Sequence, residues 1–171
     1  AQIAPCIGCN QACLDHTFSG KISSCLVNPH SCFETELAVK AAQMPKKVAI
    51  VGAGPAGLAT AITAAQCGHS VTVFEKSNEI GGQLNLAKQV PGKEEFWGLV
   101  DWFKTMVDDL KIELRLSQIA KADDLAAFDE IIVATGVVPR DPQIPGQDSP
   151  HVFGYLDVLT GNANLGEKVV V

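Results

Sequence analysis

The feature that most constrains the fold is a glycine pattern, Gly52-Ala-Gly54-Pro-Ala-Gly57, between an apolar run and an alanine-rich run. The apolar run 48–51 predicts a buried strand, and residues 56–67 predict a helix that ends at Gly68. In such a turn the glycines permit a tight bend, a close backbone approach to a pyrophosphate, and close helix–strand packing. The predicted phosphate-binding residues are Gly52, Ala53, Gly54, Pro55, Ala56 and Gly57.

A second apolar run, 70–74, follows the helix and ends at Glu75, 18 residues after Gly57. A carboxylate at the end of the second strand hydrogen-bonds the adenosine ribose hydroxyls, and its charge repels a 2′-phosphate. Glu75 is therefore predicted to bind ribose, with Lys76 beside it in the same site. The alternative, a glycine turn and a surface glutamate without a ligand, is disfavoured by the strand–helix–strand context.

The rest of the chain continues the alternation of helices and strands. Apolar residues three and four positions apart predict an amphipathic helix over 93–110, and two apolar runs predict strands over 112–116 and 130–134. This alternation is typical of a doubly wound, Rossmann-like α/β domain with a parallel sheet, which we assign to residues 46–167. Residues 1–45 are broken by proline and glycine and predict an irregular segment with a short helix near 34–43.

Four cysteines, Cys6, Cys9, Cys13 and Cys25, lie in that irregular segment with the spacing C-x2-C-x3-C-x11-C. Thiolates at this spacing can hold the corners of an iron–sulfur cluster. A tetrathiolate zinc site is an alternative, although zinc sites more often show two C-x2-C pairs. Disulfides are a second alternative, disfavoured because disulfide frameworks belong to short secreted domains. The segment has few large apolar residues to form a core, so a bound metal group would stabilise its fold.

Charge and hydropathy exclude two classes of partner. Lysine and arginine number 13 against 19 acidic residues, and no basic run exceeds the pair Lys46-Lys47, which argues against nucleic-acid binding. No apolar stretch is long enough to cross a membrane, and the first residues lack the pattern of a signal peptide, so we expect a cytoplasmic protein. The four histidines are scattered, and no catalytic residue is predicted.

Taken in order, these motifs resemble the old-yellow-enzyme-type iron–sulfur flavoproteins, in particular the bacterial NADPH-dependent 2,4-dienoyl-CoA reductases. The resemblance rests on the cysteine quartet, the glycine fingerprint, Gly81-Gly-Gln83, the run 89–96 and the run 134–140, and it covers nearly the whole chain. It implies further FAD contacts at Gly82, Gln83, Lys93, Ala120, Ala134, Thr135 and Gly136. Enoate reductases and other NAD(P)H:flavin oxidoreductases of the family are alternatives, as is a zinc-stapled nucleotide-binding module.

The resemblance also implies an electron path and partner domains. NADPH would reduce FAD, a [4Fe–4S] cluster on Cys6, Cys9, Cys13 and Cys25 would take single electrons, and FMN in a TIM barrel would reduce an acyl-CoA thioester. Neither the barrel nor an NAD(P) domain lies within these 171 residues, although the apolar run 168–171 is expected to begin the latter. We therefore expect the chain alone not to catalyse the full reaction.

Overall fold

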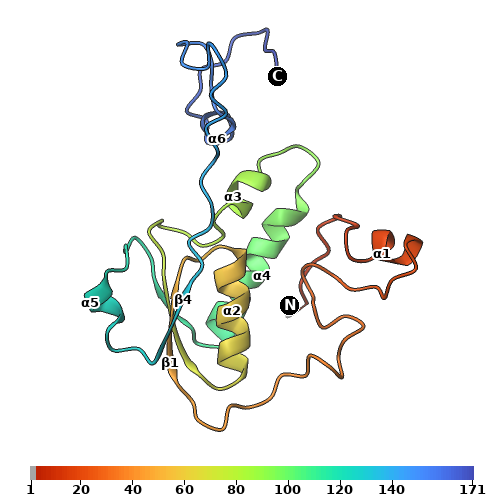
Figure 1. Ribbon diagram of the computed structural model, residues 1–171, viewed down its shortest axis with the longest axis vertical. Coiled ribbons are helices and arrows are strands. Elements are labelled where there is room, and N and C mark those ends of the chain that lie inside the picture. Colours follow the sequence, from red (N-terminus) through yellow and green to blue (C-terminus); the bar gives the residue numbers. More distant parts are fainter. Residues whose placement is uncertain (1–2) are drawn as a thin grey trace.

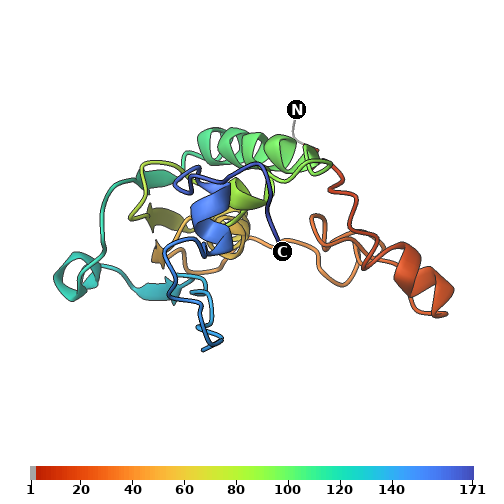
Figure 2. The same cartoon turned by 90° about the horizontal axis from the view of Figure 1, so that it is seen from above.

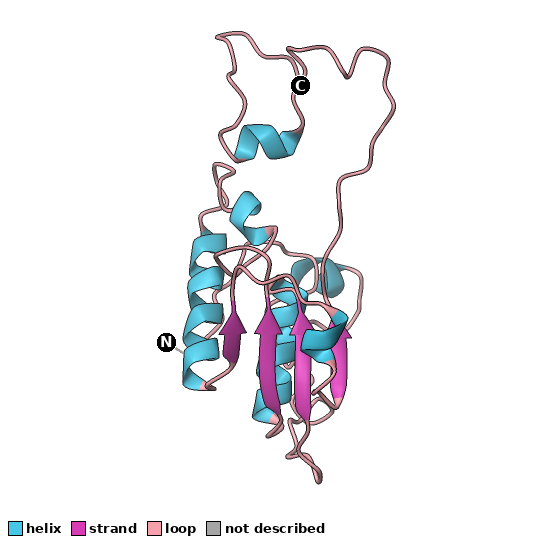
Figure 3. Ribbon diagram, turned by 90° about the vertical axis from the view of Figure 1, so that its left-hand side faces the viewer, coloured by secondary structure: helices cyan, strands magenta, loops and turns pink. Residues whose placement is uncertain are grey.

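The centre of the molecule is a parallel β-sheet, seen in a computed structural model that describes residues 3–171. Ala1 and Gln2, with which the predicted segment 1–45 begins, lie outside the described residues. The strands are β1 (Lys47–Val51), β2 (Ser70–Phe74), β3 (Glu113–Arg115) and β4 (Glu130–Val133), in the order β3-β2-β1-β4 (Figure 3). Every pair is parallel. The predicted Rossmann-like α/β fold is confirmed.

Two helices cover one face of this sheet. They are α2 (Pro55–Gln66) and α4 (Glu95–Asp109), which lie beside each other on the same side of the strands (Figure 2). Leu58 of α2 and Phe103 of α4 join Ile50 and Val73 in a single apolar core. Burial of these side chains is the main stabilising contribution, at roughly 1.5–3 kcal/mol for each large one.

The opposite face is covered less completely. Near β2 it is closed by Phe128, whose ring meets Phe74 edge-on at a centroid distance of 5.9 Å. The short helix α5 (Ala122–Leu125) lies in the connection between β3 and β4. On β4, however, Ile131 and Val133 are 48% and 72% exposed, so this edge of the sheet carries apolar side chains that the described residues leave uncovered.

The cysteine-rich segment lies to one side of the sheet as a series of turns (Figure 1). Its one described helix is α1 (Leu14–Phe18), which the sequence did not indicate. The helix expected near 34–43 is wrong, because the backbone makes only turns around Phe33. Leu37 and Val39 are 47% and 41% exposed, and a short helix without a packed face does not repay its nucleation.

Beyond β4 the chain rises past the carboxyl ends of the strands (Figure 1). It forms one short helix, α6 (Tyr155–Leu159), and otherwise loops. The run 168–171 forms no strand here, and Val170 is 98% exposed, so its place at the start of an NAD(P) domain stays a prediction. No helix in residues 3–171 combines the length and apolar character that a membrane crossing requires.

Candidate functional site

The predicted glycine turn lies where β1 ends and α2 begins, at the carboxyl edge of the sheet. Gly52 has φ +111°, and a Cβ there would lie 2.3 Å from the carbonyl oxygen of Ala134. A Cβ at Gly57 would lie 1.9 Å from the carbonyl oxygen of Gly52. Both positions therefore require glycine for packing, which accounts for the first and third glycines of the pattern. A Cβ at Gly54, in contrast, would meet no atom within 4 Å, so this backbone faces open space where a ligand can approach.

The second glycine-rich loop closes over the first. Gly82 has φ +53°, and a Cβ there would lie 3.0 Å from the Cα of Gly54. The N–H of Gly81 donates to the carbonyl oxygen of Ala53 at 2.8 Å. Gly82 is thus brought directly against the predicted phosphate-binding turn, although the two are far apart in sequence.

A third loop, which follows β4, completes this edge. Ala134 donates its N–H to the carbonyl oxygen of Val51 at 2.8 Å, so Thr135 and Gly136 leave the sheet beside the glycine turn. The amide nitrogen of Gln83 donates to the carbonyl oxygen of Val137 at 3.2 Å and links the second loop to the third. The structure therefore gathers three of the predicted motifs at one edge of the sheet, where parallel α/β folds bind their ligands.

Glu75 is held rigidly at the same edge. Its side chain is buried, with 8% exposed, and its two oxygens accept N–H groups from Ala53 at 2.7 Å and Ser77 at 2.9 Å. Each carboxylate oxygen has a second lone pair, which leaves acceptor capacity for ribose hydroxyls. Lys76, the next residue, is exposed. Gln118 donates its N–H to the Glu75 carbonyl at 2.9 Å, and Ala120 follows Gln118 by two residues.

The N-terminus of α2 carries a partial positive charge that favours an anion. Pro55 is the first residue of α2 and lacks an N–H, while the next N–H groups of the first turn have no acceptor within the helix. Ala56 is exposed and Gly57 is buried, so the Ala56 end of the turn faces outward. The helix dipole adds a partial positive charge at this point. This cradle fits a pyrophosphate group.

Lys93, another predicted contact, is not brought into this cradle. Its side chain is exposed, its N–H donates to Val90, and its ammonium lies 5.8 Å from the ring centroid of Phe96. Two polar residues that no sequence motif indicated, Lys88 and Asn85, lie in or beside α3 (Leu84–Ala87), directly after the second glycine loop.

The four predicted cysteine ligands are all free thiols in a single segment. Cys6 and Cys13 are exposed, and Cys9 and Cys25 are half-buried. The N–H of Gly8 points to the Cys6 sulfur at 3.4 Å. The four thiols have the donor chemistry of a cluster site, but within residues 3–171 no three His, Cys, Asp or Glu side chains are gathered closely enough to hold a metal ion.

The backbone nevertheless brings the last cysteine back toward the first three. Ser24 donates its N–H to the carbonyl oxygen of Ala12 at 2.7 Å, which places the residues before Cys13 and Cys25 side by side. The hydroxyls of Thr17 and Ser23 are 2.7 Å apart and reinforce the same contact.

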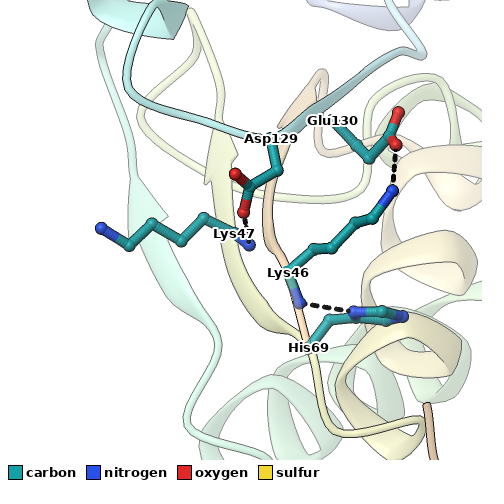
Figure 4. Close-up of polar contacts among 5 residues, drawn as sticks. All are labelled: Lys46, Lys47, His69, Asp129 and Glu130. Carbon is teal, nitrogen blue, oxygen red and sulfur yellow. Dashed lines mark hydrogen bonds and ion pairs between the residues drawn. The ribbon is translucent and has the colours of Figure 1, made fainter. Parts of the chain in front are cut away.

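The amino edge of the sheet is built differently, from side-chain contacts (Figure 4). Lys46 forms an ion pair with Glu130, and the N–H of Lys47 donates to the Asp129 carboxylate at 2.7 Å. His69 accepts the N–H of Lys46 on Nδ1 at 3.0 Å. The pKa of Lys46 is raised above its ordinary value, mainly by the hydrogen bond to Glu130 and next by the negative charge of Glu130. These contacts attach β1 to β4 and the preceding chain to β2.

Comparison with known proteins agrees with this fold. The sequence profile of the pyridine nucleotide-disulphide oxidoreductase family matches residues 46–170. A metal reductase of Desulforamulus reducens is 39% identical over 99% of this chain, and a cinnamate reductase of Clostridium sporogenes is 37% identical over 99%. The chain spans 26% of the length of each of these relatives.

A solved structure of 2-naphthoyl-CoA reductase in complex with 2-naphthoyl-CoA superposes on 95% of this chain, with a TM-score of 0.89 and 38% identity. The chain covers 25% of that protein. The chain belongs to the pyridine nucleotide-disulphide oxidoreductase family of flavoprotein oxidoreductases and has its FAD-binding, Rossmann-like fold.

Proposed function

We propose that this chain is the FAD-binding and electron-transfer part of a flavin-dependent reductase that acts on conjugated acyl substrates. The observation that carries the proposal is the convergence of Gly54, Gly82 and Ala134 at one edge of the sheet, beside the buried carboxylate of Glu75. The cinnamate and 2-naphthoyl-CoA reductases, both named for conjugated acyl compounds, support the substrate class. NADPH-dependent 2,4-dienoyl-CoA reduction is our first candidate for the reaction, and enoate reduction is the second.

Each group at the carboxyl edge has a distinct role in this proposal. The N–H groups at the start of α2 bind the pyrophosphate, and Gly54 leaves room for it. Glu75 binds the adenosine ribose with the lone pairs that Ala53 and Ser77 leave free. The contact between Gln83 and Val137 holds the two outer loops together at the edge of the sheet where FAD would bind. FAD, when bound, supplies a group that accepts a hydride and returns single electrons.

We further propose that Cys6, Cys9, Cys13 and Cys25 are the ligands of a [4Fe–4S] cluster. The support is their spacing, their free thiols and the N–H of Gly8 directed at the Cys6 sulfur. Binding would draw the side chains together, and the cluster would then act as the staple that this turn-rich segment lacks. The partners for electron exchange, an NAD(P) domain and an FMN-containing TIM barrel, are proposed to belong to the same polypeptide.

The FAD proposal is tested by titrating the purified protein with FAD and, separately, with NADP⁺. We expect saturable FAD binding, seen as quenching of flavin fluorescence, and weaker binding of NADP⁺ because the Glu75 carboxylate repels a 2′-phosphate. Preferential binding of NADP⁺ over FAD would contradict the proposal.

The cluster proposal is tested by anaerobic reconstitution with iron and sulfide, followed by metal analysis and absorbance near roughly 400 nm. We expect iron, sulfide and a broad absorbance band that reductant bleaches. One zinc per chain with no iron would instead support the zinc-stapled nucleotide-binding module.

A further inference from the structure

The first and last of the proposed metal ligands lie beside side chains that pack on the core of the α/β domain. Ile7, the residue after Cys6, is half-buried and packs against the apolar core that the sheet forms with α2 and α4. Val27, two residues after Cys25, is also half-buried and packs against the same core. Side chains packed in this way are restrained by many close contacts. Both ends of the cysteine quartet are therefore attached to the domain.

Further contacts of the same segment reach both helices of the domain. A Cβ on Gly98 of α4 would lie 3.5 Å from the Cγ of Pro5, so the proline that precedes the first ligand rests on this helix. At the other end, residues 26–30 line a cavity of about 480 Å³ together with Phe103 of α4 and Pro55, the first residue of α2. The attachment thus extends to the start of α2, where the proposed phosphate site lies.

The two middle ligands have exposed neighbours instead. Gly8 and Asn10, on either side of Cys9, are exposed. Leu14, which follows Cys13, is 47% exposed. A metal group bound by all four sulfurs would fix the middle of the segment relative to its two ends. Because those ends are attached to the domain, the free energy of metal binding should stabilise the domain together with the segment.

We propose that Ile7 and Val27 are positioning residues of the metal site. They hold Cys6 and Cys25 against the α/β domain, so that a metal group on the quartet stabilises the nucleotide-binding domain as well as its own segment. The inference rests on the proposed metal site and holds for an iron–sulfur cluster and for zinc, since four thiolates bind either. It adds to the ligands two apolar side chains that the cysteine spacing does not indicate.

The test measures how much metal loading raises the melting temperature of the domain. Ile7→Ala and Val27→Ala are compared with two controls from the same segment, Leu14→Ala and Ile22→Ala, whose side chains are 47% and 68% exposed. Each protein is melted before and after anaerobic loading with iron and sulfide and, in a separate arm, with Zn²⁺ alone. Far-UV circular dichroism follows the helices and strands of the domain, and metal analysis gives the bound metal per chain.

We expect loading to raise the melting temperature of the unsubstituted protein and of both controls by about 5 °C or more. In Ile7→Ala and Val27→Ala the rise should fall to less than about half, because the ligands are no longer held against the domain. A merely structural role would lower the melting temperature equally with and without metal and would leave the rise unchanged. The arm that gives the rise, iron and sulfide or zinc, identifies the metal group.

Conservative variants separate positioning from misfolding. Ile7→Val and Val27→Ile keep a branched apolar side chain at each position and should restore most of the rise. If an alanine variant does not fold, Ile7→Thr or Val27→Thr replaces it, because threonine keeps the branched shape and loses apolar contact.

Two results would overturn the inference, and a third lies outside it. An unchanged rise in Ile7→Ala and Val27→Ala, or an equal loss of the rise in the two controls, would remove these residues from the metal site. An unsubstituted protein that binds metal without any rise would likewise show that the segment and the domain are not coupled. An unsubstituted protein that binds neither iron and sulfide nor zinc would overturn the proposed metal site itself.

Discussion

The α/β domain and the cysteine segment are held together by different means. In the domain, Ile50 and Val73 are completely buried against two helices. In the segment before it, Leu14 and Phe18 are 47% and 84% exposed, and the chain is held mainly by turns and a few polar contacts. A domain with a core positions its own site, whereas a segment without one would depend on the proposed cluster for its final arrangement.

The largest effect is expected from replacing the four quartet cysteines by serine. Serine hydroxyls do not replace thiolates as iron ligands, so iron and sulfide incorporation should be lost completely, while the α/β domain keeps its secondary structure. Metal analysis and circular dichroism are the measurements. Cys67→Ser, at the end of α2, is the control and should retain the cluster; equal loss in the control would contradict the assignment.

A pair of glycine variants separates packing from ligand binding in the domain. Gly57→Ala places a methyl group 1.9 Å from the Gly52 carbonyl oxygen, so we expect a loss of about 3 kcal/mol in the free energy of unfolding. Gly54→Ala meets no protein atom within 4 Å and should fold normally but bind FAD at least about tenfold more weakly. Urea unfolding and FAD titration measure the two effects. Normal FAD affinity in Gly54→Ala would show that the cofactor does not approach this backbone.

The sequence was sufficient to predict the parallel sheet, because the buried strands and the glycine turn carry local signals. Gly52 and Gly57 are required by contacts that any bound or free state must satisfy. The burial of Lys88 had no such local signal, because it depends on Trp97 and on the position of α3. The helix expected near 34–43 failed for the related reason that composition does not reveal whether Leu37 finds a packing partner.

A smaller effect is expected from Glu75→Gln. The amide presents one acceptor oxygen to the two backbone N–H groups and turns its NH2 toward the other, so FAD affinity should fall by about tenfold. The measurement is FAD titration at constant ionic strength. Glu79→Gln, an exposed neighbour, is the control and should bind as the unsubstituted protein does. Equal affinities in the two variants would remove Glu75 from the ribose site.

The smallest effect is expected at the amino edge, from Lys46→Met. Because Glu130 raises the pKa of Lys46, the stabilisation by this pair is fully present below the ordinary lysine pKa and is lost as pH rises through the raised one. Both side chains are about half exposed, so the change in melting temperature at neutral pH should be the smallest of this series. Melting curves at about pH 7 and about pH 11.5 check this, and the difference between variant and unsubstituted protein should shrink at the higher pH. A difference that grows would contradict the assignment.

The most direct test of the central claim is the content of iron, acid-labile sulfide and FAD per chain after anaerobic reconstitution and removal of unbound material. We predict about four iron atoms, about four sulfides and about one FAD, with the iron lost and the FAD retained when the quartet is replaced by serine. One zinc in place of iron, or a protein that retains no FAD, would contradict the account.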